Sequence, residues 1–369
     1  MMERTTSARC FPRGMTPYLA AIVCLLCSVL VARTVSAQSG PAALAEIAAY
    51  KGPDRTARLI AGAKQEDEVD VYTSETVDDE AALSAAFQKK YGLRLKLWRG
   101  SANDILQRTV TEARGGRFAV DAIETGAITM ESLEREQLLQ RVNSPAFADL
   151  KPEAIRPHQE WIGTRYNVFV AAYNTGAVNK SDLPKSYADL ANSKWKGKLG
   201  VEAESSDWFG TLTEAMGGES GVALFRNIVA KNGISVRRGH TLLANLVVSG
   251  EVPLAISTYL YKVAQLTGRG APIDWFVIPP VVARFEGVGV ARHAPHPYAA
   301  MLYLDFMLTD AQAILAGRDF LPASAKVPPS AVATLPPGTA LTFIDPGKAL
   351  DQNQNWSTTY RQIIMNQAP

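Results

Sequence analysis

Residues 69–76 read VDVYTSET, and residues 93–101 read LRLKLWRGS. Both stretches alternate apolar and polar residues, which is typical of β-strands, and both end in a short polar turn. Helical periodicity follows each of them, from Asp78 to Tyr91 and from Ala102 to Arg114. Strand and helix units in alternation predict an α/β fold with a mainly parallel sheet and helices on both of its faces.

A third unit of the same kind covers residues 119–133, with Glu124-Thr125-Gly126 as the expected loop between strand and helix. Loops that follow parallel strands meet at one edge of a sheet, and this edge is where ligands bind in such folds. Ser74, Ser101 and Thr125 lie in the three loops. Each of them alone is typical of a helix cap. Three at equivalent positions favour an edge that faces a ligand.

Residues 164–174, TRYNVFVAAYN, predict a long buried strand that crosses between two lobes. A second α/β region follows it, with single strands expected at 195–201, 252–256 and 273–282, and helices at about 212–216 and 297–308. The organisation that we expect is a signal peptide (1–37), an N-terminal helical segment (38–68), lobe 1 (69–164, with a return segment at 287–321), and lobe 2 (165–286, with a C-terminal segment at 322–369 that packs onto the body).

The first 37 residues are typical of a secretory leader. Three arginines precede an apolar run at residues 19–32, and small residues follow at 35–37. The run is shorter than the ~20 residues of a membrane span, which favours cleavage before Gln38 over anchoring. All three cysteines lie inside this leader, so the exported chain is predicted to be free of cysteine and periplasmic.

Charge and motifs exclude several functions. Loss of the leader changes the net charge from +2 to about −1, which gives no electrostatic argument for nucleic acid or for an anionic membrane surface. The sequence has no G-x-S-x-G elbow, H-E-x-x-H helix, calcium loop or P-loop. We therefore expect a monomeric binding protein without catalytic residues or cofactor. An exported hydrolase or transferase on the same scaffold is the alternative class.

Several segments, in this order, resemble bacterial extracellular solute-binding proteins of the ferric-iron ABC importer group. They are Val71-Tyr72-Thr73-Ser74, Arg99-Gly100-Ser101, Ala171-Ala172-Tyr173-Asn174, Trp195-Lys196-Gly197-Lys198, residues 259–262, and residues 296–300 running into 304–308. The resemblance covers about residues 69–328. It implies a type II periplasmic binding fold, with a ligand cleft between two lobes and hinge strands that let them close. It also implies an ABC transporter permease in the inner membrane as the partner.

The resemblance bears on the cargo as well. Iron-binding members carry a consecutive tyrosine pair in the second lobe, and Thr258 and Tyr259 align with its two positions. A histidine and an acidic ligand of some members fall near Thr76 and Gly126, and Glu124 is close enough to replace the acid. If the cargo is iron(III) or chelated iron, Tyr259 and Glu124 are thus the implied metal ligands. A small organic or oxo-anion held by Ser, Thr and Arg donors is the rival cargo.

The candidate ligand-binding residues share a position in predicted loops or crossing strands. They are Tyr72, Ser74, Arg99, Ser101, Glu124, Thr125, Arg165, Ser205, Trp208, Thr258 and Tyr259. The alternative for Arg99 and Arg165 is that they are solvated surface arginines, which are more common than arginines that hold a ligand. Trp208 is expected either to stack on a ligand or to cover the wall of the cleft.

Overall fold

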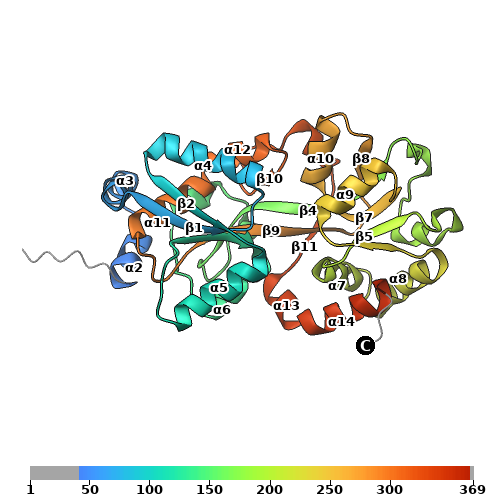
Figure 1. Cartoon of the computed structure of the whole chain (residues 1–369), viewed down its shortest axis with the longest axis horizontal. Coiled ribbons are helices and arrows are strands. Elements are labelled where there is room, and N and C mark those ends of the chain that lie inside the picture. The colour runs from blue at the N-terminus through green and yellow to red at the C-terminus, as the bar shows by residue number, and fades with distance from the viewer. Residues whose placement is uncertain (1–40, 366–369) are drawn as a thin grey trace, which may run out of the picture. The chain divides into compact units, whose positions relative to one another are not determined.

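The computed structural model describes residues 41–365 (Figure 1). The predicted signal peptide, residues 1–37, lies outside the described residues. Among residues 41–365 no single helix is long and apolar enough to cross a membrane, although Pro297–Leu308 and Asp310–Gly317 together meet that test as a pair bent by 49°.

One sheet of eleven strands runs through the described chain in the order β2-β1-β3-β9-β4-β7-β5-β6, with β8 and β10 beside β4 and β11 beside β9. The strands are β1 (Glu68–Thr73), β2 (Arg94–Arg99), β3 (Ala122–Gly126), β4 (Ile162–Asn174), β5 (Leu199–Glu202), β6 (Ser235–Arg237), β7 (Leu254–Tyr259), β8 (Ile273–Phe276), β9 (Val281–Val290), β10 (Leu321–Pro322) and β11 (Leu341–Phe343).

Helices cover this sheet, and the connections add short 3-10 turns. The helices are α2 (Pro41–Ala49), α3 (Arg55–Glu66), α4 (Val77–Tyr91), α5 (Ala102–Arg114), α6 (Ala127–Arg135), α7 (Ser206–Ala215), α8 (Glu219–Asn232), α9 (His240–Ser249), α10 (Leu260–Gly268), α11 (Pro297–Leu308), α12 (Asp310–Gly317), α13 (Pro346–Asp351) and α14 (Asn353–Ile364).

Lobe 1 contains the three predicted strand and helix units. Strand β1 pairs in parallel with β2 on one side and with β3 on the other. Helices α4 and α12 lie on one face of these strands, and α5 and α6 lie on the other (Figure 1). Helix α5 begins where the sequence predicts it, because Ser101 and Asp104 form a reciprocal capping box.

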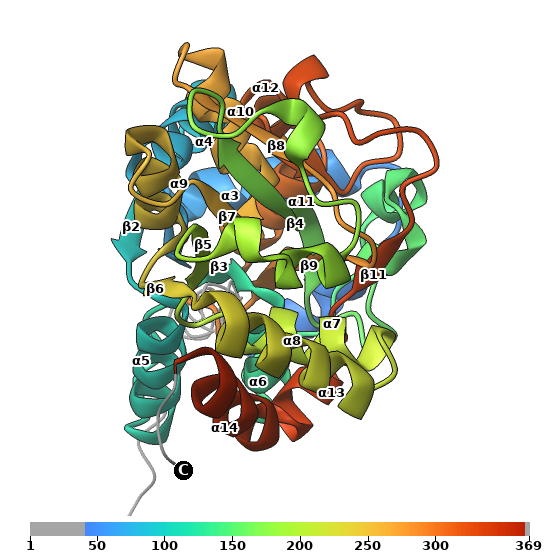
Figure 2. The same cartoon turned by 90° about the vertical axis from the view of Figure 1, so that its right-hand side faces the viewer.

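Lobe 2 repeats the layered plan around β7, β5 and β6, which also pair in parallel. Helices α9 and α10 lie on one face, and α7, α8 and α14 lie on the opposite face (Figures 1 and 2). The predicted two-lobed α/β fold is confirmed.

Strands β4 and β9 run through both lobes. The first half of β4 pairs antiparallel with β9, and its second half pairs with β7 and β8. Strand β9 in turn pairs with β3 of lobe 1. All thirteen residues of β4 are buried, which explains why this strand reads as a continuous apolar run with few charges.

The structure corrects four local predictions. Residues 273–282 form two strands rather than one, because Pro279 and Pro280 separate β8 from β9. Glu124 and Thr125 lie inside β3 and not in a loop, since pairing with β9 continues to Gly126. Helix α7 begins at Ser206, earlier than its apolar residues indicate. In the predicted strand 195–201, only the part from Leu199 is extended.

The segments before and after the lobes pack onto them. Helices α2 and α3 contact α11 of lobe 1. At the other end, β11 pairs with β9, α13 packs on α6, and α14 packs on α7 and α8. The C-terminal segment therefore contacts both lobes.

Candidate functional site

The crossing strands β4 and β9 bring together four polar side chains. Arg165 is the register partner of Glu286, and Asn167 is the register partner of Arg284. Side chains two residues apart on a strand point to the same face, so these four lie on one face of the strand pair. Asn167 Nδ2 donates to Glu286 Oε1 at 2.9 Å, and Arg284 Nη1 lies 3.2 Å from Asp207 Oδ2 of α7.

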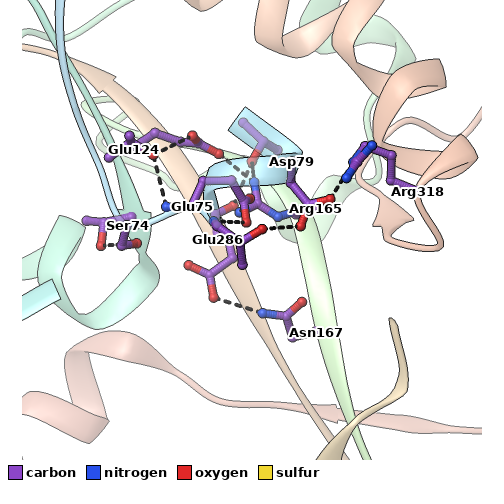
Figure 3. Close-up of polar contacts among 12 residues, drawn as sticks. Ser74, Glu75, Asp79, Glu124, Arg165, Asn167, Glu286 and Arg318 are labelled. Carbon is purple, nitrogen blue, oxygen red and sulfur yellow. Dashed lines mark hydrogen bonds and ion pairs between the residues drawn. The ribbon is translucent and has the colours of Figure 1, made fainter. Parts of the chain in front are cut away.

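On the lobe 1 side, Arg165 binds two carboxylates. Its Nη1 donates to Glu124 Oε1 at 2.5 Å, and its Nη2 donates to Glu75 Oε2 (Figure 3). All three side chains are at most 5% exposed. Burial raises the pKa of Glu75 to about 7, although the guanidinium of Arg165 opposes the shift. The expectation of a solvated Arg165 is therefore wrong: Arg165 is the buried centre of this ion-pair cluster.

Two more carboxylates stand beside this cluster at the start of α4. Asp79 pairs with Arg318, which follows α12 (Figure 3). Glu80 is buried, and its Oε2 has no hydrogen-bond partner within residues 41–365. Desolvation by burial raises the pKa of Glu80 to about 8, and the nearby Glu124 adds to the shift. Burial therefore favours the protonated form of Glu80.

On the lobe 2 side, Tyr259 ends β7 and caps the start of α10. Its hydroxyl is buried and has no hydrogen-bond partner in the described chain. Burial raises the pKa of Tyr259 well above 10, while the nearby Arg284 lowers it. The guanidinium of Arg284 stands 5.3 Å from the centre of the tyrosine ring. Tyr259 thus presents a neutral phenol beside an arginine and two carboxylates, Asp207 and Glu286.

Aromatic rings connect the two sides. The His240 ring lies 3.8 Å from the Tyr259 ring, Tyr259 is 5.9 Å from Tyr261, and Tyr261 is 4.3 Å from Phe320. Arg165 then lies 5.0 Å above the Phe320 ring. These successive ring contacts connect α9 and α10 of lobe 2 with Arg165, the arginine of the ion-pair cluster.

Charge decides what the arrangement can bind. Within residues 41–365, the four carboxylates of Glu75, Glu124, Glu286 and Asp207 form ion pairs with two guanidiniums, those of Arg165 and Arg284, and the Lys262 ammonium also lies near Glu75. An excess of buried negative charge must be neutralised by protons or by a bound cation. The raised pKa of Glu75 indicates that, in the free protein, a proton on this carboxylate offsets part of the negative charge. A bound cation with oxygen ligands would displace this proton.

The predicted site residues divide into two groups. Those that join the cluster are Glu124, Arg165 and Tyr259, with Ser74 and Thr125 beside it through a 2.9 Å contact between their hydroxyls. The others are placed as follows: Tyr72 donates to Glu112 of α5, Arg99 to the Glu75 carbonyl, Ser101 to Asp104, Ser205 to Glu202 and Thr258 to the Val170 carbonyl, while Trp208 is fully buried against Phe169 and Phe225.

Sequence reasoning missed Glu75, Asp207, His240, Arg284 and Glu286. The sequence does carry a signal for the last two, because Arg284 and Glu286 are charged residues at alternate positions in an otherwise apolar strand. Charges that share the buried face of a strand need partners, which points to a polar site. No such signal marks Glu75, Asp207 and His240, because only the folded chain shows that they lie near this polar site.

His240 begins α9 beside Tyr259. Its Nδ1 lies 3.0 Å from the Ser257 carbonyl oxygen, which can only accept, so Nδ1 carries the proton. Burial, with Arg284 nearby, lowers the pKa of His240 to about 3. The imidazole is therefore neutral and holds its lone pair on Nε2.

A second polar group lies away from this cluster. Ligand atoms of Asp70, Asp121 and His296 come within 4.8 Å of one another. Asp121 accepts from the backbone N–H groups of Asp70 and His296, at 2.8 and 2.7 Å, and from the His296 ring. These bonds fix the start of α11, which His296 precedes.

Comparison with known proteins gives the family. The family described as bacterial extracellular solute-binding protein matches residues 124–350, more than half of the chain. The chain belongs to this family. The family predicted from the sequence motifs is thereby confirmed.

Individual relatives of this solute-binding protein are distant. Iron uptake protein A1 of Synechocystis is 26% identical over 284 residues, which cover 72% of this chain and 78% of the relative. The structure of iron-bound HitA from Pseudomonas aeruginosa has a TM-score of 0.68 at 21% identity, covering 78% of this chain and 99% of that one. The periplasmic binding protein AfuA from Actinobacillus pleuropneumoniae, solved with fructose-6-phosphate, has a TM-score of 0.69 at 17% identity, covering 81% and 98%. These structures show the shared fold.

Proposed function

We propose that this protein binds ferric iron, free or chelated, in the periplasm, and delivers it to an ABC importer. The observation that carries the proposal is the excess of buried carboxylates around Arg165 and Arg284, next to the unpartnered hydroxyl of Tyr259. Carboxylate and phenolate oxygens are hard ligands, which suit a small, highly charged cation. A relative named for iron uptake supports the same cargo.

Binding of the metal requires that Tyr259 loses its proton, because the ligand is the phenolate. Burial holds the phenol neutral in the free protein. A trivalent ion supplies the charge that makes the phenolate stable in this buried place. Glu286 lies near both Tyr259 and Tyr261, and of its two oxygens Oε1 accepts from Asn167 while Oε2 makes no hydrogen bond within residues 41–365. We therefore propose Glu286 as a carboxylate ligand ahead of Glu124, both of whose oxygens accept, from Arg165 and Thr73.

A small organic or oxo-anion is the rival cargo. AfuA, which shares the fold, was solved with a sugar phosphate, and the Nε atoms of Arg165 and Arg284 have no hydrogen-bond partner within residues 41–365. An anion alone would add charge to a site that already has too many carboxylates, which disfavours it. A ferric chelate would suit both the excess carboxylates and the unpartnered arginine Nε atoms, because the metal neutralises the carboxylates while the chelator accepts hydrogen bonds from the arginines.

Transport requires no chemical step. The two lobes share β4 and β9, so a cargo that contacts residues of both lobes favours their closed arrangement, which a permease in the inner membrane would recognise. The exported hydrolase or transferase is the other class. Turnover of a panel of esters and phosphates would reveal it.

Titration with ferric citrate tests the proposal. We expect a visible phenolate-to-iron charge-transfer band in the parent protein and its loss in Tyr259→Phe. Tyr173→Phe is the matched control, because Tyr173 is a buried lobe 2 tyrosine on β4 whose hydroxyl donates to Asp274 at 3.3 Å. If no band appears while an organic anion raises the melting temperature, the iron proposal fails. The binding-protein class then stands.

A further inference from the structure

We propose that His240 is a ligand of the cargo metal through its Nε2 atom, an inference that rests on the proposed iron cargo. His240 comes from α9 of lobe 2, and no sequence pattern places it near Tyr259.

Two contacts fix the imidazole. Nδ1 donates to the Ser257 carbonyl oxygen at 3.0 Å, and the ring lies against the Tyr259 ring, tilted by 32° with 3.8 Å between centroids. Metal-binding histidines characteristically donate their other ring N–H to a carbonyl or carboxylate, which sets the tautomer and the direction of the lone pair. The Ser257 contact sets the tautomer of His240 and the direction of its Nε2 lone pair in the metal-free protein.

The second nitrogen is left without a partner. No residue between 41 and 365 makes a hydrogen bond to Nε2; Glu202 Oε2 lies 3.9 Å from it, and the guanidinium of Arg284 is also nearby. A neutral Nε2 and a carboxylate oxygen are both acceptors, so their approach is unfavourable until a proton donor or a cation joins them. The His240 side chain is 19% exposed, so the ring is not fully enclosed by the described chain.

Glu202 acts as a positioning residue for this ligand. Its Oε1 accepts from the Gly239 N–H at 2.9 Å, and its Oε2 accepts from the Glu204 N–H and the Ser205 hydroxyl. These bonds tie the residue before α9 to the end of β5. The first turn of α9 therefore holds His240 over Tyr259, and the phenol and the imidazole form adjacent ligands for one ion.

The test is spin-echo EPR of the full chain loaded with ferric citrate, a chelator without nitrogen. We expect a ¹⁴N modulation from an imidazole bound to the high-spin ferric ion, replaced by a ¹⁵N signal when histidine is ring-labelled. His240→Gln should lose the modulation and weaken iron binding by about tenfold or more. His296→Gln is the matched control, since His296 is also an imidazole beside carboxylates, and it should keep both.

The outcomes separate the two proposals. If the parent binds iron with a phenolate band but shows no nitrogen modulation, or if the modulation disappears in His296→Gln instead, the His240 proposal is overturned and the iron proposal stands. If the parent shows no iron band at all, the proposed function itself fails. The ¹⁵N spectrum shows that a histidine binds the iron, and a modulation that persists in each of His158→Gln, His293→Gln and His296→Gln assigns it to His240 even if His240→Gln does not fold.

Discussion

Arg165→Met should destabilise the protein strongly, and more at alkaline pH than at acid pH. The substitution keeps an apolar stem against the Phe320 ring, which Arg165 contacts at 5.0 Å, but removes the guanidinium that pairs with the carboxylates of both Glu75 and Glu124. Breaking a buried ion pair by removing one partner typically costs about 3–5 kcal/mol. We expect a loss of that size at pH 8.

The pH dependence follows from Glu75. Burial raises its folded-state pKa to about 7, above its ordinary value of 4.5, so its favourable contribution to stability is complete below pH 4.5 and is lost as the pH rises through about 7. Without Arg165, which opposes this shift, the folded-state pKa rises further. One pKa unit corresponds to about 1.4 kcal/mol, so protonation of Glu75 at pH 5 should recover about 1–3 kcal/mol of the loss.

Urea unfolding at pH 5 and pH 8 measures both values. Arg238→Met is the control, because Arg238 is 81% exposed and its ion pair with Glu204, at 3.3 Å, is also on the surface. That change should cost less than about 1 kcal/mol at either pH. An equal loss for Arg165→Met at the two pH values, or a loss at pH 8 no larger than the control, would refute the reasoning.

Three more predictions concern other parts of the chain. Gly221→Ala should cost about 1–3 kcal/mol in urea unfolding, because a Cβ there would lie 2.7 Å from the Thr213 carbonyl oxygen, whereas Gly115→Ala, with its nearest atom at 3.4 Å, should be close to neutral. Asp121→Asn should destabilise the protein more at pH 6 than at pH 9, because the Asp121 hydrogen bond raises the pKa of His296. The stabilisation by this interaction is present below about pH 6.5 and is lost as the pH rises through the raised pKa. A loss of stability that is independent of pH would contradict this reasoning. Iron affinity should fall by about tenfold for each pH unit of acidification and each phenol proton that the metal displaces. Competition with a chelator of known affinity measures this dependence. An affinity that does not change with pH would exclude tyrosine ligation.

Local pattern was enough to predict most of the fold. The alternation in residues 69–76 and 93–101 and the helical period after each stretch mark β1, α4, β2 and α5. The pattern matches burial in β1, where Val69 and Val71 are buried, whereas β2 has no buried residue. The apolar run at 164–174 marks β4, since this strand is buried throughout. Where periodicity gives no signal, as at the start of α7, the boundary was wrong.

The site was harder to predict because it depends on contacts between distant segments. Glu124 and Arg165 are 41 residues apart, and Glu75 and Arg165 are 90 apart. Each has a polar surface position as its default expectation, and only the pairing of β3, β4 and β9 brings them into one buried cluster. His240 gives no sequence signal, because its role depends on a backbone carbonyl 17 residues later.

The shared strands β4 and β9 have a consequence for dissecting the molecule. Neither lobe is a continuous piece of chain, so a single cut at the exposed residues 179–182 would produce two fragments that both run through the two lobes. The first fragment would keep β4, and the second would keep β9, its antiparallel partner. Such fragments should reassemble when mixed, which suits the protein to use as a split reporter.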